Sequence, residues 1–176
     1  MTTANAGLNG TADQAIETTC SELDALGLRL MWDISAIGSS ILRIAELLGK
    51  QIGISGSQWI TLKAIEALGN GEGVAIKDVA ALLNVDRSFL SAQSKILEKR
   101  GLIHRHNAKA ADRRLVLLSL TEGAINSLKD VRPSHNALET NLRGEFDNDM
   151  LKALVSGLLT VRLRLERAVL LVAAGR

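Results

Sequence analysis

The fold is decided by residues 84–101, which have the sequence NVDRSFLSAQSKILEKRG. Asp86 is a good N-cap, because its side chain can accept hydrogen bonds from the free N–H groups of a first helical turn. Gly101 stands where a glycine often ends a helix. We therefore predict a helix over Arg87–Arg100. A shorter helix from about Ile76 to Leu83 precedes it, and the tight Asn84-Val85 turn between them makes a helix-turn-helix candidate.

The predicted helix over 87–100 has two faces on a wheel of 3.6 residues per turn. The core side carries Leu90, Ser94 and Leu97. The opposite side carries Ser88, Ala92, Lys95 and Lys99, with Ser91 at the border. Small residues permit close approach to base edges, and lysines can contact phosphates, so this side suits a DNA major groove. Arg87 lies at the helix N-terminus, which itself favours a phosphate.

The flanking segments complete a small domain. Two strand-like runs, Leu102–His106 and Leu115–Leu120, surround a basic loop over 107–114 and predict a β-hairpin. Upstream, Ser55-Gly56-Ser57-Gln58 is a capping box that opens a helix to about Leu68. Downstream, Thr121 can cap a helix that Pro133 breaks or kinks.

Two long helices are predicted outside this domain. Thr11-Ala12-Asp13-Gln14 resembles a capping box, and from there apolar residues follow heptad spacing through Leu48. Apolar residues at heptad spacing form one stripe, or heptad seam, along the helix, and we expect another helix to pack against this seam. The last helix, about Asp147 to Ala173, is apolar on nearly every side, so we expect it to be buried between subunits or beneath the first helix.

Composition and charge agree with this organisation. The 176 residues are 47% hydrophobic and 2% aromatic, which excludes a disordered chain and favours helices. The net charge is only +2, but residues 85–114 hold eight basic and three acidic residues. This local excess suits a polyanion, and the alternative is a solvated basic face.

Several classes of protein are disfavoured. The lone Cys20 cannot form an intrachain disulfide, and residues 1–10 lack a secretory signal, so we expect a cytoplasmic protein. Charged residues interrupt the apolar C-terminal stretch, and we expect no membrane segment. A nucleophile with a paired base, a phosphate-binding glycine loop and an acidic pair are not recognisable, so we expect neither an enzyme nor a cofactor.

Four motifs together resemble the MarR family of winged helix-turn-helix transcription regulators. They are Ser55-x-x-Gln58-Trp59, Lys77-Asp78-Val79-Ala80-x-Leu82-Leu83-Asn84-Val85-Asp86-Arg87-Ser88, Leu97-Glu98-Lys99-Arg100-Gly101-Leu102-Ile103-x-Arg105, and Asp112-Arg113-Arg114-x-x-x-Leu118-x-Leu120-Thr121-x-x-Gly123. The resemblance covers residues 28–173 in element order.

The resemblance implies a mainly α protein with a small β-hairpin wing. It implies an N-terminal extension and dimerisation helix over 1–50, a winged helix-turn-helix over 51–123, and C-terminal dimerisation helices over 124–176, forming a homodimer. The helix over 87–100 would be the recognition helix, with Ser88, Ser91 and Ala92 near bases. Held by Asp112, Arg114 would enter the minor groove, and Lys109 and Arg113 would contact phosphates.

This sequence departs from the family pattern in the recognition helix. Ala92 stands where a long polar residue is common, so one base contact is expected to be missing. Gln93 and Ser94 stand where apolar residues are common, which puts the packing behind the helix in question.

Some residues have competing interpretations. Relatives bind small effectors beside the dimerisation helices, so Trp32, Ser39, Arg43 and Trp59 are candidate effector-binding residues. The alternative is that Arg43 forms a salt bridge and the tryptophans fill the core. Cys20 is either a small buried residue of the heptad seam or a redox sensor. His104 and His106 share one face of a strand, but a third ligand is not apparent, so we expect no metal.

We therefore predict a regulator that binds double-stranded DNA as a homodimer. It would be a repressor, released from a pseudo-palindromic operator by a small, aromatic or anionic effector. The alternative is a winged-helix protein-interaction module that binds an acidic partner.

Overall fold

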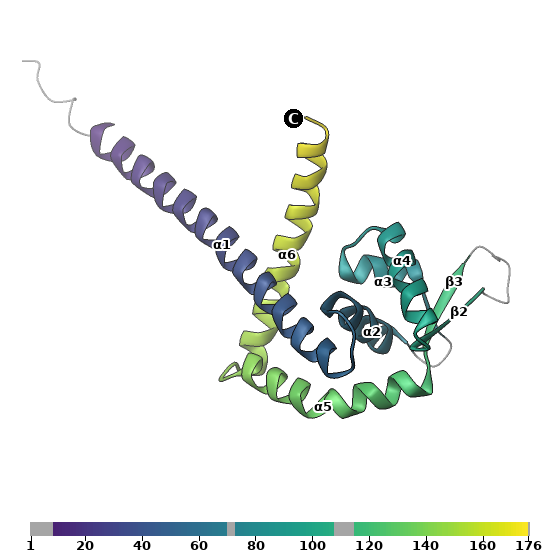
Figure 1. Ribbon diagram of the computed structural model, residues 1–176. Coiled ribbons are helices and arrows are strands. Elements are labelled where there is room, and N and C mark those ends of the chain that lie inside the picture. The colour runs from purple at the N-terminus through teal and green to yellow at the C-terminus, as the bar shows by residue number, and fades with distance from the viewer. Residues whose placement is uncertain (1–8, 70–72, 108–114, 176) are drawn as a thin grey trace, which may run out of the picture. The chain divides into compact units, whose positions relative to one another are not determined.

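The computed structural model describes residues 9–69, 73–107 and 115–175, with the side chains of 9–23 and of Pro133 outside the description. The elements follow the order α1 (Asn9–Gln51), α2 (Gly56–Leu68), β1 (Val74–Ala75), α3 (Ile76–Leu83), α4 (Arg87–Lys99), β2 (Ile103–Asn107), β3 (Val116–Leu120), α5 (Glu122–Arg143) and α6 (Asn148–Ala173). Figure 1 shows them along the chain. The chain divides into two compact units, 1–128 and 129–176. The predicted mainly α fold with a hairpin wing is confirmed.

The helix ends follow the local signals. At the start of α2, the Ser55 side chain accepts from the Gln58 backbone N–H and the Gln58 side chain accepts from the Ser55 N–H, which is the predicted capping box. Asn84 adopts the left-handed conformation after α3, and Gly101 has a φ of +69° after α4. Before α5, the Thr121 hydroxyl accepts from the Ala124 N–H at 3.1 Å.

A three-stranded antiparallel sheet has the order β1-β3-β2. In the hairpin, Ile103 pairs with Leu120 and Asn107 with Val116, as expected from the two strand-like runs. The sequence did not predict β1, because two residues are too short to show an alternating pattern. Val74 pairs with Leu118 and thereby adds the third strand.

The core of the first unit lies between α2, α3, α4 and the sheet. Its most deeply buried apolar side chains come from all of these elements: Leu62, Ile65, Val79, Leu90, Leu97, Ile103 and Leu118. Leu90, Ser94 and Leu97 are completely buried. The predicted inward side of the helix over 87–100 is therefore correct.

Among residues 24–51 of helix α1, whose burial the structure describes, only those near the C-terminal end are buried. It begins at Asn9, so Thr11 lies inside the helix and is not its N-cap, which corrects the expected start. Ala45 and Leu48 are buried, whereas the heptad residues Leu30, Ile37 and Ile41 are exposed in the single chain. Figure 1 shows α1 as one long helix that meets α2 only at its end.

In the described part of the chain, one stretch, Asp24–Gln51, is long and apolar enough to cross a membrane by length and composition. Our expectation from sequence did not include it. The stretch also carries Arg29, Asp33, Arg43 and Glu46, which would be costly in hydrocarbon. Because its C-terminal end packs against α2, we interpret its apolar face as a surface for packing against another helix.

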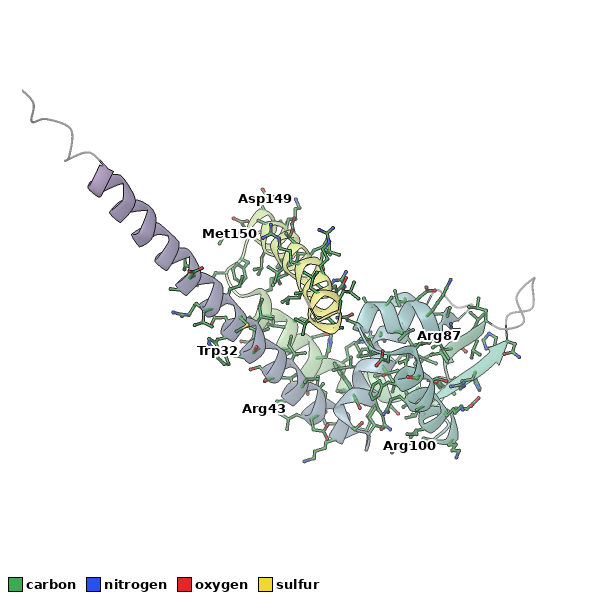
Figure 2. All side chains as sticks on the ribbon, turned by 90° about the horizontal axis from the view of Figure 1, so that it is seen from above. Trp32, Arg43, Arg87, Arg100, Asp149 and Met150 are labelled. Atoms are coloured by element: carbon green, nitrogen blue, oxygen red, sulfur yellow. The ribbon has the colours of Figure 1, made fainter. Side chains whose placement is uncertain are left out.

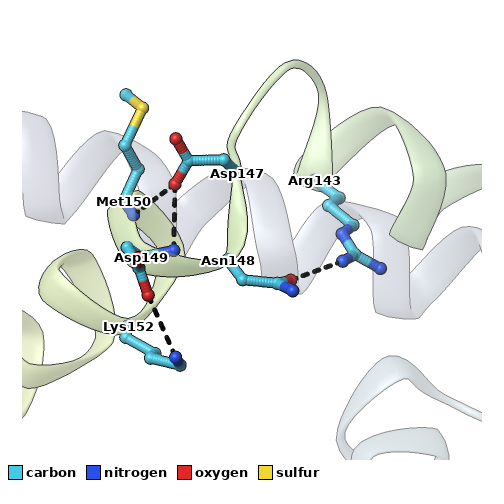
Figure 3. Close-up of polar contacts among 6 residues, drawn as sticks. All are labelled: Arg143, Asp147, Asn148, Asp149, Met150 and Lys152. Carbon is cyan, nitrogen blue, oxygen red and sulfur yellow. Dashed lines mark hydrogen bonds and ion pairs between the residues drawn. The ribbon is translucent and has the colours of Figure 1, made fainter.

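The second unit holds most of α5 and all of α6. The helix α5 continues past Pro133 to Arg143, so this proline does not break it. At the start of α6, the Asp147 carboxylate accepts from the N–H groups of Asp149 and Met150 at 2.9 and 2.8 Å, and Arg143 donates to Asn148 at 2.9 Å (Figure 3). None of the α6 residues is buried in the single chain.

Candidate nucleic-acid interface

The exposed side of α4 carries the residues predicted to contact DNA. Arg87, Ser88, Ala92 and Lys95 are exposed, and Ser91 is half-buried at the border. The completely buried Leu90 and Leu97 hold the opposite side against the core, so this exposed side is fixed in place. The arrangement offers small side chains in the first turns of the helix and a cation further along it, which suits a groove with phosphates on its rim.

One residue that was not predicted from sequence to belong to this site, Arg105, supports α4 from beneath. The Arg105 guanidinium on β2 donates through Nη1 to the Ser91 carbonyl at 3.0 Å and also contacts the Ser94 hydroxyl. Its Nε lies 3.7 Å from a carboxylate oxygen of Glu98, and the Arg105 side chain is only 13% exposed. The buried Ser94 therefore has polar partners, which explains how the core accepts a serine where an apolar residue is common.

A signal for this contact was present in the sequence. Residues alternate between the two faces of a strand, so Arg105 shares a face with the buried Ile103. Ser94 was already placed on the core side of α4. A cation and a hydroxyl that both point inward from adjacent elements would have indicated the contact.

Arg100 makes a second structural contact. Its Nη2 donates to the Gly53 carbonyl at 2.6 Å, and its Nη1 lies 3.5 Å from Oε1 of Gln58. In Figure 2, Arg87 and Arg100 both lie on the winged helix domain. Two of the eight basic residues in the local charge excess, Arg100 and Arg105, thus hold the domain together.

The wing is described only through its strands. Asn107 and Val116 face each other at the end of the hairpin, and the predicted contacts Lys109, Asp112, Arg113 and Arg114 lie outside the described residues. Both His104 and His106 are exposed on β2. Within the described residues, no group of three or more His, Cys, Asp or Glu side chains is arranged to hold a metal ion.

The four candidate effector residues are placed in two different environments. Trp32 is 64% exposed, and Figure 2 shows Trp32 and Arg43 along α1. The Ser39 hydroxyl donates to the Ser35 carbonyl of the same helix at 2.9 Å. Trp59 is only 8% exposed and belongs to the core at α2, so its ring does not share the exposed surface of Trp32.

A cavity of about 350 Å³ lies at the C-terminal end of α2. It is lined by residues of α2, β3, α5 and the segment before β1: Ile65, Glu66, Gly69, Gly73, Leu118, Ser119, Leu120 and Ile125. None of the candidate effector residues lines it.

Comparison with known proteins identifies the domain. Residues 54–124 match the family described as winged helix DNA-binding domain. No protein of curated function matches the sequence. Among solved structures, the chain is similar to a MarR family transcriptional regulator from Rhodococcus sp. RHA1, at 20% identity and a TM-score of 0.62, with 77% of this chain and 94% of that chain covered.

Two further solved structures were determined with a bound molecule. One is the S. aureus MepR-DNA complex, at 20% identity and a TM-score of 0.64, covering 76% of this chain and 96% of that chain. The other is CouR from Rhodococcus jostii RHA1 bound to p-coumaroyl-CoA, at 21% identity and a TM-score of 0.64, covering 75% of this chain and 90% of that chain.

The match over residues 54–124 identifies this part of the chain as a winged helix DNA-binding domain. The predicted resemblance to MarR family regulators is confirmed, and at these identities it is a likeness of fold.

Proposed function

We propose that this protein is a transcriptional regulator that binds an operator as a homodimer and represses transcription. The proposal is supported above all by the exposed side of α4, where Ser88 and Ala92 precede Lys95 on a helix fixed to the core. Small side chains let the helix enter a major groove, while arginine and lysine contact the phosphates that border it. Of the candidate contacts, Lys109, Asp112, Arg113 and Arg114 of the wing are proposed from the resemblance alone.

The exposed apolar residues of α1 and α6 support the homodimer. Ile37 and Ile41 on α1, and Leu158 and Leu165 on α6, are about half exposed in the single chain. Contiguous apolar surface of this kind is unfavourable in water unless another surface covers it. A second copy covers both helices by twofold symmetry and brings two recognition helices to half-sites about 34 Å apart.

We also propose that a small effector releases the protein from DNA. Arg43 is exposed towards the C-terminal end of α1 and can pair with an anionic group, and Trp32 supplies an aromatic surface on the same helix. An effector that binds better to a dimer with wrongly spaced recognition helices lowers DNA affinity by the same coupling free energy. The CouR complex shows a small molecule held by a protein of this fold.

DNA binding is tested by a gel shift with DNA from upstream of the protein's own gene and with random DNA of equal length. We expect a preference for the upstream DNA and a salt-sensitive affinity. Replacing Arg114 with alanine should weaken binding strongly without changing the thermal unfolding temperature. The absence of any preference at every salt concentration would refute the proposal. Capture of a purified acidic protein without DNA binding would support the protein-interaction module.

The effector is tested by a thermal-shift screen of small aromatic acids on the wild-type protein. We expect at least one acid to raise the unfolding temperature, and Arg43→Ala to abolish that rise. Lys50→Ala is the matched control, because Lys50 is another exposed cation near the end of α1. A rise that survives in Arg43→Ala would remove Arg43 from the effector site.

A further inference from the structure

Arg105 joins the wing to one flank of the recognition helix. Its contacts on α4 are the Ser91 carbonyl at 3.0 Å, the Ser94 hydroxyl, and the Glu98 carboxylate at 3.7 Å from Nε. Residues 91, 94 and 98 are spaced by three and four positions, so they form one stripe along the helix. We propose that Arg105 is a positioning residue that sets the rotation of α4 about its axis and thereby the sequence specificity of DNA binding.

The surroundings of this contact make it directional. Ser94 is completely buried, and its hydroxyl also donates to the Ser91 carbonyl at 2.9 Å. The planar guanidinium presents its N–H groups in a fixed geometry, so it reaches Ser91, Ser94 and Glu98 together only at one rotation of the helix. Leu90 and Leu97 hold α4 against the core, and the polar contacts add a sharper constraint on its rotation, because hydrogen bonds weaken steeply with misalignment.

A small rotation has unequal effects on the two kinds of DNA contact. Side-chain tips lie about 5 to 6 Å from the helix axis, so a rotation of about 20° moves them by about 2 Å. Such a shift breaks a hydrogen bond between Ser88 or Ser91 and a base edge. Lys95 has a long flexible chain and can still reach a phosphate. Specific affinity therefore depends on the Arg105 contact, and non-specific affinity does not.

The inference rests on the proposed function and is tested by measuring two affinities for each variant. The DNA is an operator selected by the wild-type protein from a random pool, compared with unrelated DNA at the same salt concentration. Arg105→Lys keeps the charge but loses the guanidinium fork. We expect its specific affinity to fall about tenfold, while its non-specific affinity stays within about twofold of the wild type.

A second variant perturbs the same contact from the other side. Ser94→Ala removes the hydroxyl without changing the charge, and we expect it to lower the ratio of specific to non-specific affinity as well. The double variant should lose less than the product of the two single losses, because both remove one shared contact. Lys95→Ala is the matched comparison and should lower both affinities by a similar factor.

The outcomes separate the two ideas. If the wild-type protein selects no operator, the proposed function fails. Suppose instead that it selects an operator, and that both Arg105→Lys and Ser94→Ala keep the wild-type ratio of specific to non-specific affinity. The positioning role of Arg105 is then overturned. A parallel loss of both affinities together with a lower unfolding temperature also overturns it, because that result describes a purely structural residue. If Arg105→Lys does not fold, Ser94→Ala alone decides.

Discussion

Replacing Gly56 with alanine tests the close approach of α1 and α2. Gly56 is the first residue of α2, and its N–H donates to the Glu46 carboxylate of α1 at 2.6 Å. A Cβ added at Gly56 would lie 2.7 Å from the Glu46 backbone nitrogen and 3.0 Å from its Cα. Both are backbone atoms, so the two helices would have to separate by several tenths of an ångström.

The expected effect is the balance of two terms. Glycine to alanine normally stabilises a helix by up to about 1 kcal/mol. Forcing atoms into a well-packed contact costs about 1–3 kcal/mol, and the rigid α1 backbone places this site towards the upper end. We therefore expect Gly56→Ala to lower the free energy of unfolding by about 1–2 kcal/mol, which corresponds to about 3–6 °C for a protein of this size.

The assay is thermal and urea unfolding followed by circular dichroism, at a protein concentration that is the same for all variants. Gly123→Ala is the matched control, because a Cβ there would meet only the Thr121 hydroxyl oxygen, at an ordinary 3.8 Å. We expect this control to be as stable as the wild type or slightly more stable. A Gly56→Ala protein that is as stable as Gly123→Ala would show that the two helices do not approach as closely as described.

Three further predictions concern the core, the DNA contact and the dimer. Leu90→Ala should lower the free energy of unfolding by about 2–5 kcal/mol in urea titrations, because the side chain is completely buried. Lys95→Ala should reduce the slope of log affinity against log salt by about one, and an unchanged slope would exclude a phosphate contact. Leu158→Glu should shift the protein from dimer to monomer in analytical ultracentrifugation, because it places a charge on the apolar face of α6. A dimer that persists at micromolar concentration would exclude this face from the interface.

Much of the winged helix domain was predictable because its signals are local. The capping box at Ser55 and the left-handed glycine at Gly101 act through bonds to residues within a few positions. The two sides of α4 follow from helical geometry alone, and Leu90, Ser94 and Leu97 are buried as expected. The start of α1 at Thr11 was wrong, because a capping pattern within a long helix-forming segment does not force the helix to begin there.

The roles of the basic residues were not predictable from charge counting. Arg100 binds the Gly53 carbonyl 47 positions away in the sequence, and Arg105 contacts Ser94 11 positions away. Charge counting does not reveal such partners, although the alternation of residues in β2 places Arg105 on the same face as the buried Ile103. Trp59 was a candidate for an effector site together with Trp32, but the packing of α2 buries it.

The sequence by itself determined the positions of the helices and the hairpin, the inward and outward sides of α4, and the two long apolar helices that need a partner. Each depends on hydrogen bonds or periodicity within a few residues. Only the tertiary structure decided that Arg105 and Ser94 join the wing to the recognition helix, that Gly56 lets α2 approach Glu46, and that β1 completes the sheet. These features arise where segments distant in sequence meet, and their geometry is set by packing of the whole domain.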